Sequence, residues 1–137
     1  MLFEMRRLRL ALLLLAACHG PGPSLDSVPL GTWGGDEAGI VVSENEAHVH
    51  IRCTLGDLAA PIPLDARGAF DAPGTYNVDA FPIDRGIRHP ARFTGTTDGS
   101  RLVLSVRLTD TGQVFGPVEL RLGAPPRMRV ACPICRR

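Results

Sequence analysis

The chain has 137 residues, with 15 basic residues, all arginine, against 14 acidic ones, so its formal net charge at pH 7 is +1. Apolar residues make up 45% of the sequence. The near-neutral charge argues against nucleic acid as a partner, and the apolar content argues against a wholly disordered chain. The length fits one small domain, because two domains of half this size would each lack a sufficient core.

A cleaved secretion signal is predicted at residues 1–17. The basic stretch Met5–Arg9 precedes an apolar run, Leu10–Ala17, which stops at Cys18. About 20 apolar residues are needed to cross a bilayer, and here a Gly- and Pro-rich segment follows the run at once. The order of basic, apolar and small residues is that of a signal peptide rather than of a membrane span.

The end of this signal resembles the lipobox of bacterial lipoproteins. Leu15-Ala16-Ala17-Cys18 is the motif that carries the resemblance. The resemblance implies that the Cys18 thiol is acylated with palmitate-type chains and that Cys18 becomes the mature N-terminus, with an unlipidated signal peptide as the alternative. Two or more acyl chains hold a protein stably on a membrane. The expected location is therefore the bacterial cell envelope, lipid-anchored and extracytoplasmic.

The rest of the chain divides into a tether, one domain and a short tail. Residues 18–30 comprise the lipidated Cys18 and a segment rich in Gly, Pro and Ser, which predicts a stiffened tether. Residues 31–132 form a single β domain, and residues 133–137 form a C-terminal tail.

The C-terminal half of the domain predicts a meander of three strands. Along Arg101–Thr109, apolar residues alternate with polar ones, which is the period of a half-buried strand. Turn-forming residues flank this stretch at 98–100 and 110–112. The neighbouring strands are predicted at 91–97 and 113–122, with a bulge or sheet edge at Gly116-Pro117.

The N-terminal half predicts further short strands at 39–43, 47–53, 68–71 and 75–80. Residues 60–64 contain two prolines, so only an edge or irregular strand fits there. No segment of the mature chain shows a helical apolar stripe ten residues long. About eight short strands predict an all-β fold, either a small antiparallel meander barrel or a β-sandwich.

The opening of the domain resembles that of a known group of barrels. Gly31-Thr32-Trp33-Gly34-Gly35 is similar to the first strand of lipocalin-like and avidin-like barrels, the calycins. That resemblance implies a meander barrel, often with a small ligand, in which Trp33 closes one end. The chain also resembles uncharacterised bacterial secreted domains with the same opening, which implies no activity. Trp33 is either a large core residue or a ligand contact.

Three cysteines remain after Cys18, and an oxidising compartment favours a disulfide between two of them. Cys53 shares its parity with Val49 and Ile51, and Cys132 shares its parity with Val130, so both are predicted to point at the core. Cys53–Cys132 is the preferred pair, and it would contribute roughly 4 kcal/mol by the loop-entropy estimate. Cys53–Cys135, Cys132–Cys135 and free thiols are the alternatives.

Cys132-Pro133-Ile134-Cys135 also has the spacing of redox and zinc motifs. A redox role favours a helix N-terminus in an α/β unit, which the predicted fold lacks. Zinc would need two further ligands, and His48 with His50, on one face of a strand, is the available pair. An exposed histidine pair is more often a solvated face, and zinc is incompatible with a disulfide at Cys132.

No catalytic arrangement can be named from the sequence. The serines lack a nucleophile-elbow context, and no phosphate loop or calcium loop is present. A polar cluster in the segment 79–90 predicts a loop at the mouth of a barrel, where ligand sites usually lie; its members are Asp79, Asp84, Arg85, Arg88 and His89. The alternative is a solvated connection whose charges pair locally.

These observations predict a non-enzymatic binding or interaction module, with no cofactor and no bound metal. Its partners are the membrane, through the acyl chains, and either a small apolar ligand or an envelope protein. Possible ligand contacts are Trp33, Arg85, Arg88 and His89. The alternative is a small hydrolase or zinc-dependent protein that uses His48 and His50 with Cys132 and Cys135, or the Arg85–His89 loop.

Overall fold

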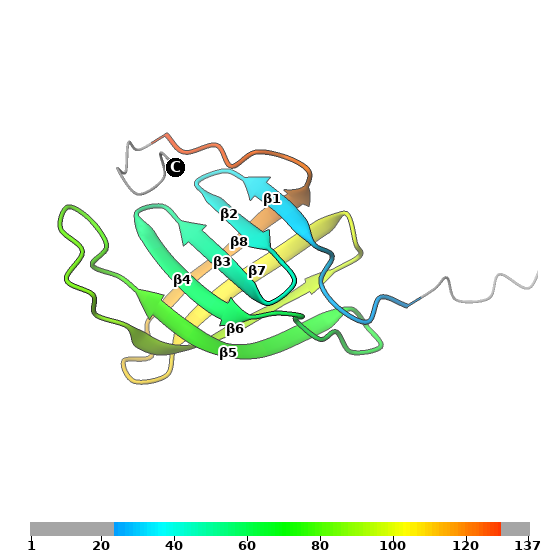
Figure 1. The fold of residues 1–137 in the computed structure, drawn as a ribbon, viewed down its shortest axis with the longest axis horizontal. Helices are drawn as coiled ribbons and strands as arrows, with labels where there is room; N and C mark the ends of the chain where they lie inside the picture. Colours follow the sequence, from blue (N-terminus) through cyan, green and yellow to red (C-terminus); the bar gives the residue numbers. More distant parts are fainter. Residues whose placement is uncertain (1–23, 130–137) are drawn as a thin grey trace, which may run out of the picture.

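The computed structural model describes residues 24–129. Eight strands follow one another in a meander, each antiparallel to the next, and the last pairs with the first to close a barrel (Figure 1). The predicted all-β fold is thereby confirmed, and of the two architectures the chain adopts the barrel. The strands are β1 Gly31–Gly35, β2 Ala38–Val42, β3 Glu46–Ile51, β4 Thr54–Ala59, β5 Ala69–Asn77, β6 His89–Thr97, β7 Arg101–Leu108 and β8 Val114–Leu122. Among the described residues, no helix is long and apolar enough to span a membrane.

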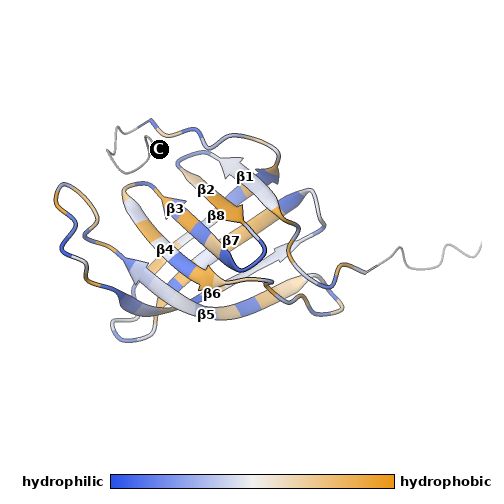
Figure 2. Ribbon diagram, viewed as in Figure 1, coloured by the Kyte–Doolittle hydropathy of each residue, from blue (hydrophilic) through white to orange (hydrophobic). Residues whose placement is uncertain are grey.

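Alternation of apolar and polar residues builds the barrel wall. In β7, every second side chain is buried, from Leu102 to Leu108, while Arg101 and Arg107 are exposed. Figure 2 shows the same alternation of hydrophobic and hydrophilic residues along β3. Because successive side chains of a strand point to opposite faces, one apolar set fills the interior and one polar set faces water.

Aromatic rings fill the interior where glycines leave room. Tyr76 and Phe93 are completely buried, with their ring centroids 6.1 Å apart in an edge-to-face arrangement. A Cβ on Gly56 would collide with both rings, and a Cβ on Gly74 would collide with that of Phe93. The glycines of β4 and β5 therefore make space inside the wall for the two largest side chains of this end of the core.

The Gly-Gly of the opening motif lets two segments approach β1 closely. A Cβ on Gly34 would overlap the backbone of Pro125, and a Cβ on Gly35 would overlap the carbonyl oxygen of Glu119. The chain after β8 runs beside β1, where the Arg127 amide donates to the Gly35 carbonyl at 3.0 Å. Gly35 thus makes room for β8, and Gly34 makes room for the segment that follows it.

The chain enters the barrel at a closed end. Val28 is buried, and its amide donates to the Ile62 carbonyl at 3.0 Å. Trp33 is also completely buried, and its indole N–H donates to the Pro29 carbonyl at 3.0 Å. Part of the stretch expected to be a tether therefore packs on the barrel, and Trp33 lies at the end where the chain enters.

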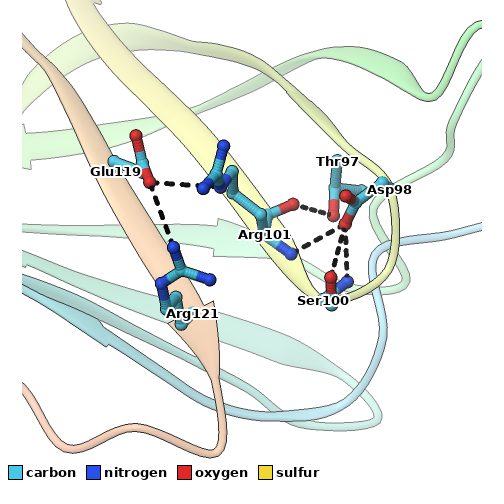
Figure 3. A network of polar contacts seen from close by, with 6 residues as sticks. All are labelled: Thr97, Asp98, Ser100, Arg101, Glu119 and Arg121. Carbon is cyan, nitrogen blue, oxygen red and sulfur yellow. Dashed lines mark hydrogen bonds and ion pairs between the residues drawn. The ribbon is translucent and has the colours of Figure 1, made fainter.

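A capped turn joins β6 to β7 at the same end (Figure 3). The Asp98 carboxylate accepts hydrogen bonds from the Ser100 and Arg101 amides, both at 2.8 Å. Gly99, between Asp98 and Ser100, has a φ of +97°, a conformation that suits glycine. These bonds, led by that from the Arg101 amide, lower the pKa of Asp98 to about 2.

Several predicted strand boundaries are wrong. β4 was not expected, because Gly56 and Asp57 interrupt its apolar pattern. β5 is one continuous strand rather than two, since Pro73 pairs with Arg92 of β6 but lies beyond the last residue that pairs with β4. Residues 60–64 form no strand and contribute only an isolated bridge at Pro63.

The parity argument for Cys53 is also wrong. β3 ends at Ile51, so Cys53 lies in the β3–β4 turn, half-buried, and not on the inward face of a strand.

The predicted bulge at Gly116-Pro117 is present as a register shift against β7. The bulge changes which side chains of β8 point inward, so that Phe115 packs against the core while Val114 is exposed.

Candidate functional site

Two polar clusters stand out among residues 24–129: a histidine pair on the barrel wall and a loop at one end of the barrel. The pair consists of His48 and His50, which project outward from β3, with Asp57 directly opposite His48 on β4. The loop joins β5 to β6 over residues 78–88 and contains Arg85 and Arg88, two of the four residues predicted as ligand contacts.

The three side chains of the wall cluster form a chain of hydrogen bonds. His48 Nδ1 lies 2.5 Å from Asp57 Oδ1, and His48 Nε2 lies 2.7 Å from His50 Nε2. The two rings are in an edge-to-face arrangement, with their centroids 4.5 Å apart. Because a carboxylate can only accept, Nδ1 of His48 carries the hydrogen toward Asp57.

Burial lowers the pKa of His50. The neighbouring His48 ring lowers it further, whereas the Asp57 carboxylate opposes the shift. His50 lies opposite Gly39 of β2, whose outward face contacts Pro126. The segment after β8 thus covers the neighbourhood of this ring. The side chain of His48 is 40% exposed, so the cluster is open to solvent on the His48 side.

The loop of residues 78–88 is organised by one carboxylate. Asp84 Oδ1 accepts hydrogen bonds from the Gly86 amide at 2.7 Å and from the side-chain amide of the buried Asn77 at 2.8 Å. The Gly86 amide is the larger cause, and Asn77 the smaller, of the lowered pKa of Asp84. Arg88 Nη1 lies 3.8 Å from the same oxygen.

The remaining residues predicted in the loop lie apart from one another. His89 Nδ1 lies 2.8 Å from Asp110 Oδ2 in the β7–β8 turn, and this hydrogen bond is the main cause of the lowered pKa of Asp110. Arg85 is exposed and lines a hollow of about 210 Å³ with Phe81 and Ile83. Within the described part of the chain, no ion pair to Arg85 is present. Trp33 is not near these residues, because it lies buried at the opposite end.

Two larger hollows flank Pro117 on the surface. One, of about 400 Å³, lies between the β3–β4 turn and the start of β8, where Ile51, Thr54 and Phe115 line it. The other, of about 410 Å³, lies beside the seam of β1 and β8, where Asp36, Glu119 and Arg127 line it. The first half of β8 extends past the paired part of β1, so the space beside it is open.

The remaining predicted site residues fall largely outside the described residues. Cys18, Cys132 and Cys135 all lie there, so lipidation and the Cys53–Cys132 pairing stay predictions. Cys53 has an interaction partner and is not free. Among residues 24–129, no three His, Cys, Asp or Glu side chains converge on a metal-sized space.

Sequence reasoning missed the roles of Asp57 and Asp110. Each carboxylate lies on a different strand or turn from the histidine that it contacts. The spacing of residues within one segment therefore does not predict either contact. The pairing of His48 with Asp57 follows only from the β3–β4 register, and β4 was not predicted.

No family model, no curated protein and no solved structure matches this chain.

Proposed function

We propose that this protein is a lipid-anchored, extracytoplasmic binding module of the bacterial cell envelope, without enzymatic activity, that contacts an envelope protein through the loop of residues 78–88. One observation supports this proposal above the others. The loop exposes large apolar side chains beside arginines, at the end of the barrel opposite to the end where the chain enters (Figure 1).

The topology supports the opposite placement of anchor and loop. β1 and β5 run in the same direction, since each strand is antiparallel to its neighbour. The segment before β1 and the loop after β5 therefore lie at opposite ends. Val28 is packed on the entry end, so the chain between Cys18 and Leu25 spans at most about 20–25 Å. A lipid on Cys18 would keep the entry end near the membrane and direct the loop away from it.

The composition of the loop is that of a protein-binding surface. Phe81, Ile83 and Ile87 are 42%, 72% and 44% exposed. Aromatic residues and arginine are enriched where proteins bind one another, and apolar side chains form the centre of such patches. Arg85 and Arg88 would face carboxylates of the partner, which we expect to present an apolar patch rimmed by acidic residues.

The packed interior favours a protein partner over a small apolar ligand. Tyr76 packs against both Phe93 and Phe115, with 4.9 Å between the ring centroids of Tyr76 and Phe115. The hollows described above lie on the surface. A ligand of calycin type would need space that these rings occupy.

Site-specific cross-linking of the full-length protein in its host tests the proposal. A photoreactive amino acid at position 83 should give one discrete cross-linked species, which Arg85→Glu should reduce severalfold. Arg107→Glu, the same charge change on the exposed face of β7, should leave the amount of the cross-linked species unchanged. The same photoreactive group at position 41, on the exposed face of β2, should give no such species.

Three outcomes would contradict the proposal. They are the absence of a cross-link at position 83, a cross-link that does not respond to Arg85→Glu, and a species with the mass of two copies of this chain. The last would indicate self-association.

A further inference from the structure

The wall cluster brings two imidazole rings of one strand together beside a carboxylate. We propose that His48 Nε2 and His50 Nε2 together bind a divalent copper ion, with Asp57 as the carboxylate that orients His48. This site is independent of the loop of residues 78–88 and of the lipid anchor.

The hydrogen-bond chain sets the tautomer of His48. Asp57 accepts the hydrogen bond from Nδ1 of His48, so Nε2 of a neutral His48 ring carries a lone pair. That lone pair accepts a hydrogen bond from Nε2 of His50 at 2.7 Å. A metal ion bound by both nitrogens would displace this hydrogen bond and lie off the line between the two atoms, and the neutral His50 ring would then hold its hydrogen on Nδ1. A carboxylate on the far nitrogen of a ligating histidine is the usual support of such ligands, because it fixes the tautomer and the orientation of the ring.

The strand holds the pair in place before any metal binds. Residues 48 and 50 are two apart on β3, so both side chains leave the same face. β3 pairs on both sides, with β2 and with β4, so its backbone is fixed. His48 and Asp57 are 40% and 48% exposed in their side chains, which lets a hydrated ion enter and keep water ligands.

The chemistry of the ligands, two imidazoles and water, favours copper over zinc. Tetragonal nitrogen and oxygen sites suit Cu²⁺, and imidazole ligands bind Cu²⁺ more tightly than Zn²⁺ in the usual order of affinities.

Titration of the purified full-length protein with Cu²⁺, followed by electron paramagnetic resonance, tests this site. We expect one tetragonal Cu²⁺ per chain with hyperfine coupling to two imidazole nitrogens. His50→Gln should remove the two-nitrogen spectrum. Asp57→Asn should weaken binding by 10–100-fold while keeping two nitrogens, as loss of an orienting carboxylate does. His89→Gln, which changes the histidine beside Asp110, should leave affinity and spectrum unchanged.

Circular dichroism would verify that each variant keeps the barrel. The proposal is overturned if folded wild type binds no stoichiometric Cu²⁺, if His50→Gln keeps the wild-type spectrum, or if Zn²⁺ binds as tightly as Cu²⁺. An unchanged affinity in Asp57→Asn would overturn the role of the carboxylate.

Discussion

Gly35 packs directly against the carbonyl of Glu119 where the barrel closes, and a Cβ at this position would overlap that oxygen. Replacing Gly35 with Ala should therefore separate β1 from β8. We expect a loss of about 1–3 kcal/mol in the free energy of unfolding, the usual cost of inserting a methyl group into a packed site. Urea denaturation measures this loss.

Thr32 on the same strand is the matched control, because its side chain is exposed. Thr32→Ala should change the free energy of unfolding by no more than about 0.5 kcal/mol. Equal stability of Gly35→Ala and wild type would show that the two strands do not meet as described.

Tyr76 gives the barrel a stability that alkali removes. Burial raises the pKa of Tyr76 to about 12, from an ordinary value of 10.0. The unfolded chain loses this proton near pH 10 while the folded chain keeps it, so the contribution is complete below pH 10 and is lost as the pH rises toward 12. Tyr76 is the single tyrosine of the chain, so phenolate absorbance reports this group alone.

Tyr76→Phe should flatten the dependence of stability on pH between 10 and 12. At pH 7 it should cost about 1 kcal/mol, because the hydroxyl hydrogen bond of 2.7 Å with Thr54 is lost. Phenolate absorbance that appears near pH 10 in the folded protein would contradict the burial of this side chain.

The Asp98 cap should contribute stability at neutral pH that acid removes. Its folded pKa of about 2 lies below the ordinary value of 3.8, so the contribution is present above about pH 4 and is lost as the pH falls toward 2. Asp98→Asn keeps the acceptor oxygen without the charge. Its melting temperature should lie below that of wild type at pH 7 and approach it at pH 2.

The exposed Glu44 of the β2–β3 turn provides the comparison for Asp98. Glu44→Gln should show a smaller difference from wild type at pH 7. A difference for Asp98→Asn that persists undiminished at pH 2 would mean that the charge is not its cause.

Lipidation of Cys18 would place the protein in the membrane fraction. Cys18→Ala should move the protein from the membrane fraction to the soluble fraction, because acyl chains supply the membrane affinity. Immunoblots of separated membranes measure this change. If the variant stays with the membrane in full, the acyl chains on Cys18 are not the anchor.

The period-two pattern was sufficient for the fold class, and the turns at Gly99 and Gly112 were found from local chemistry. β4 escaped prediction because Gly56 makes room for Tyr76 and Phe93, a reason that exists only in the folded barrel. The continuity of β5 through Pro73 has a similar cause, since the tolerance for proline depends on where the pairing with β4 ends.

The site residues divide in the same way. His48 and His50 could be placed on one face from their spacing, and the structure brings their Nε2 atoms to 2.7 Å. Asp57 could not be placed, because its contact with His48 depends on strand register. Arg85 and Arg88 lie in one loop and His89 directly follows it, yet Arg88 pairs with Asp84 and His89 with Asp110.

Depth-dependent fluorescence quenching would test the proposed orientation of the barrel on a membrane. The acylated full-length protein would be placed in vesicles that carry a headgroup quencher, with a fluorescent amino acid at position 24 or at position 83. We expect strong quenching at position 24, next to the anchor, and little at position 83. Quenching at position 83 as strong as at position 24 would contradict the proposed orientation, because the loop of residues 78–88 would then lie on the membrane.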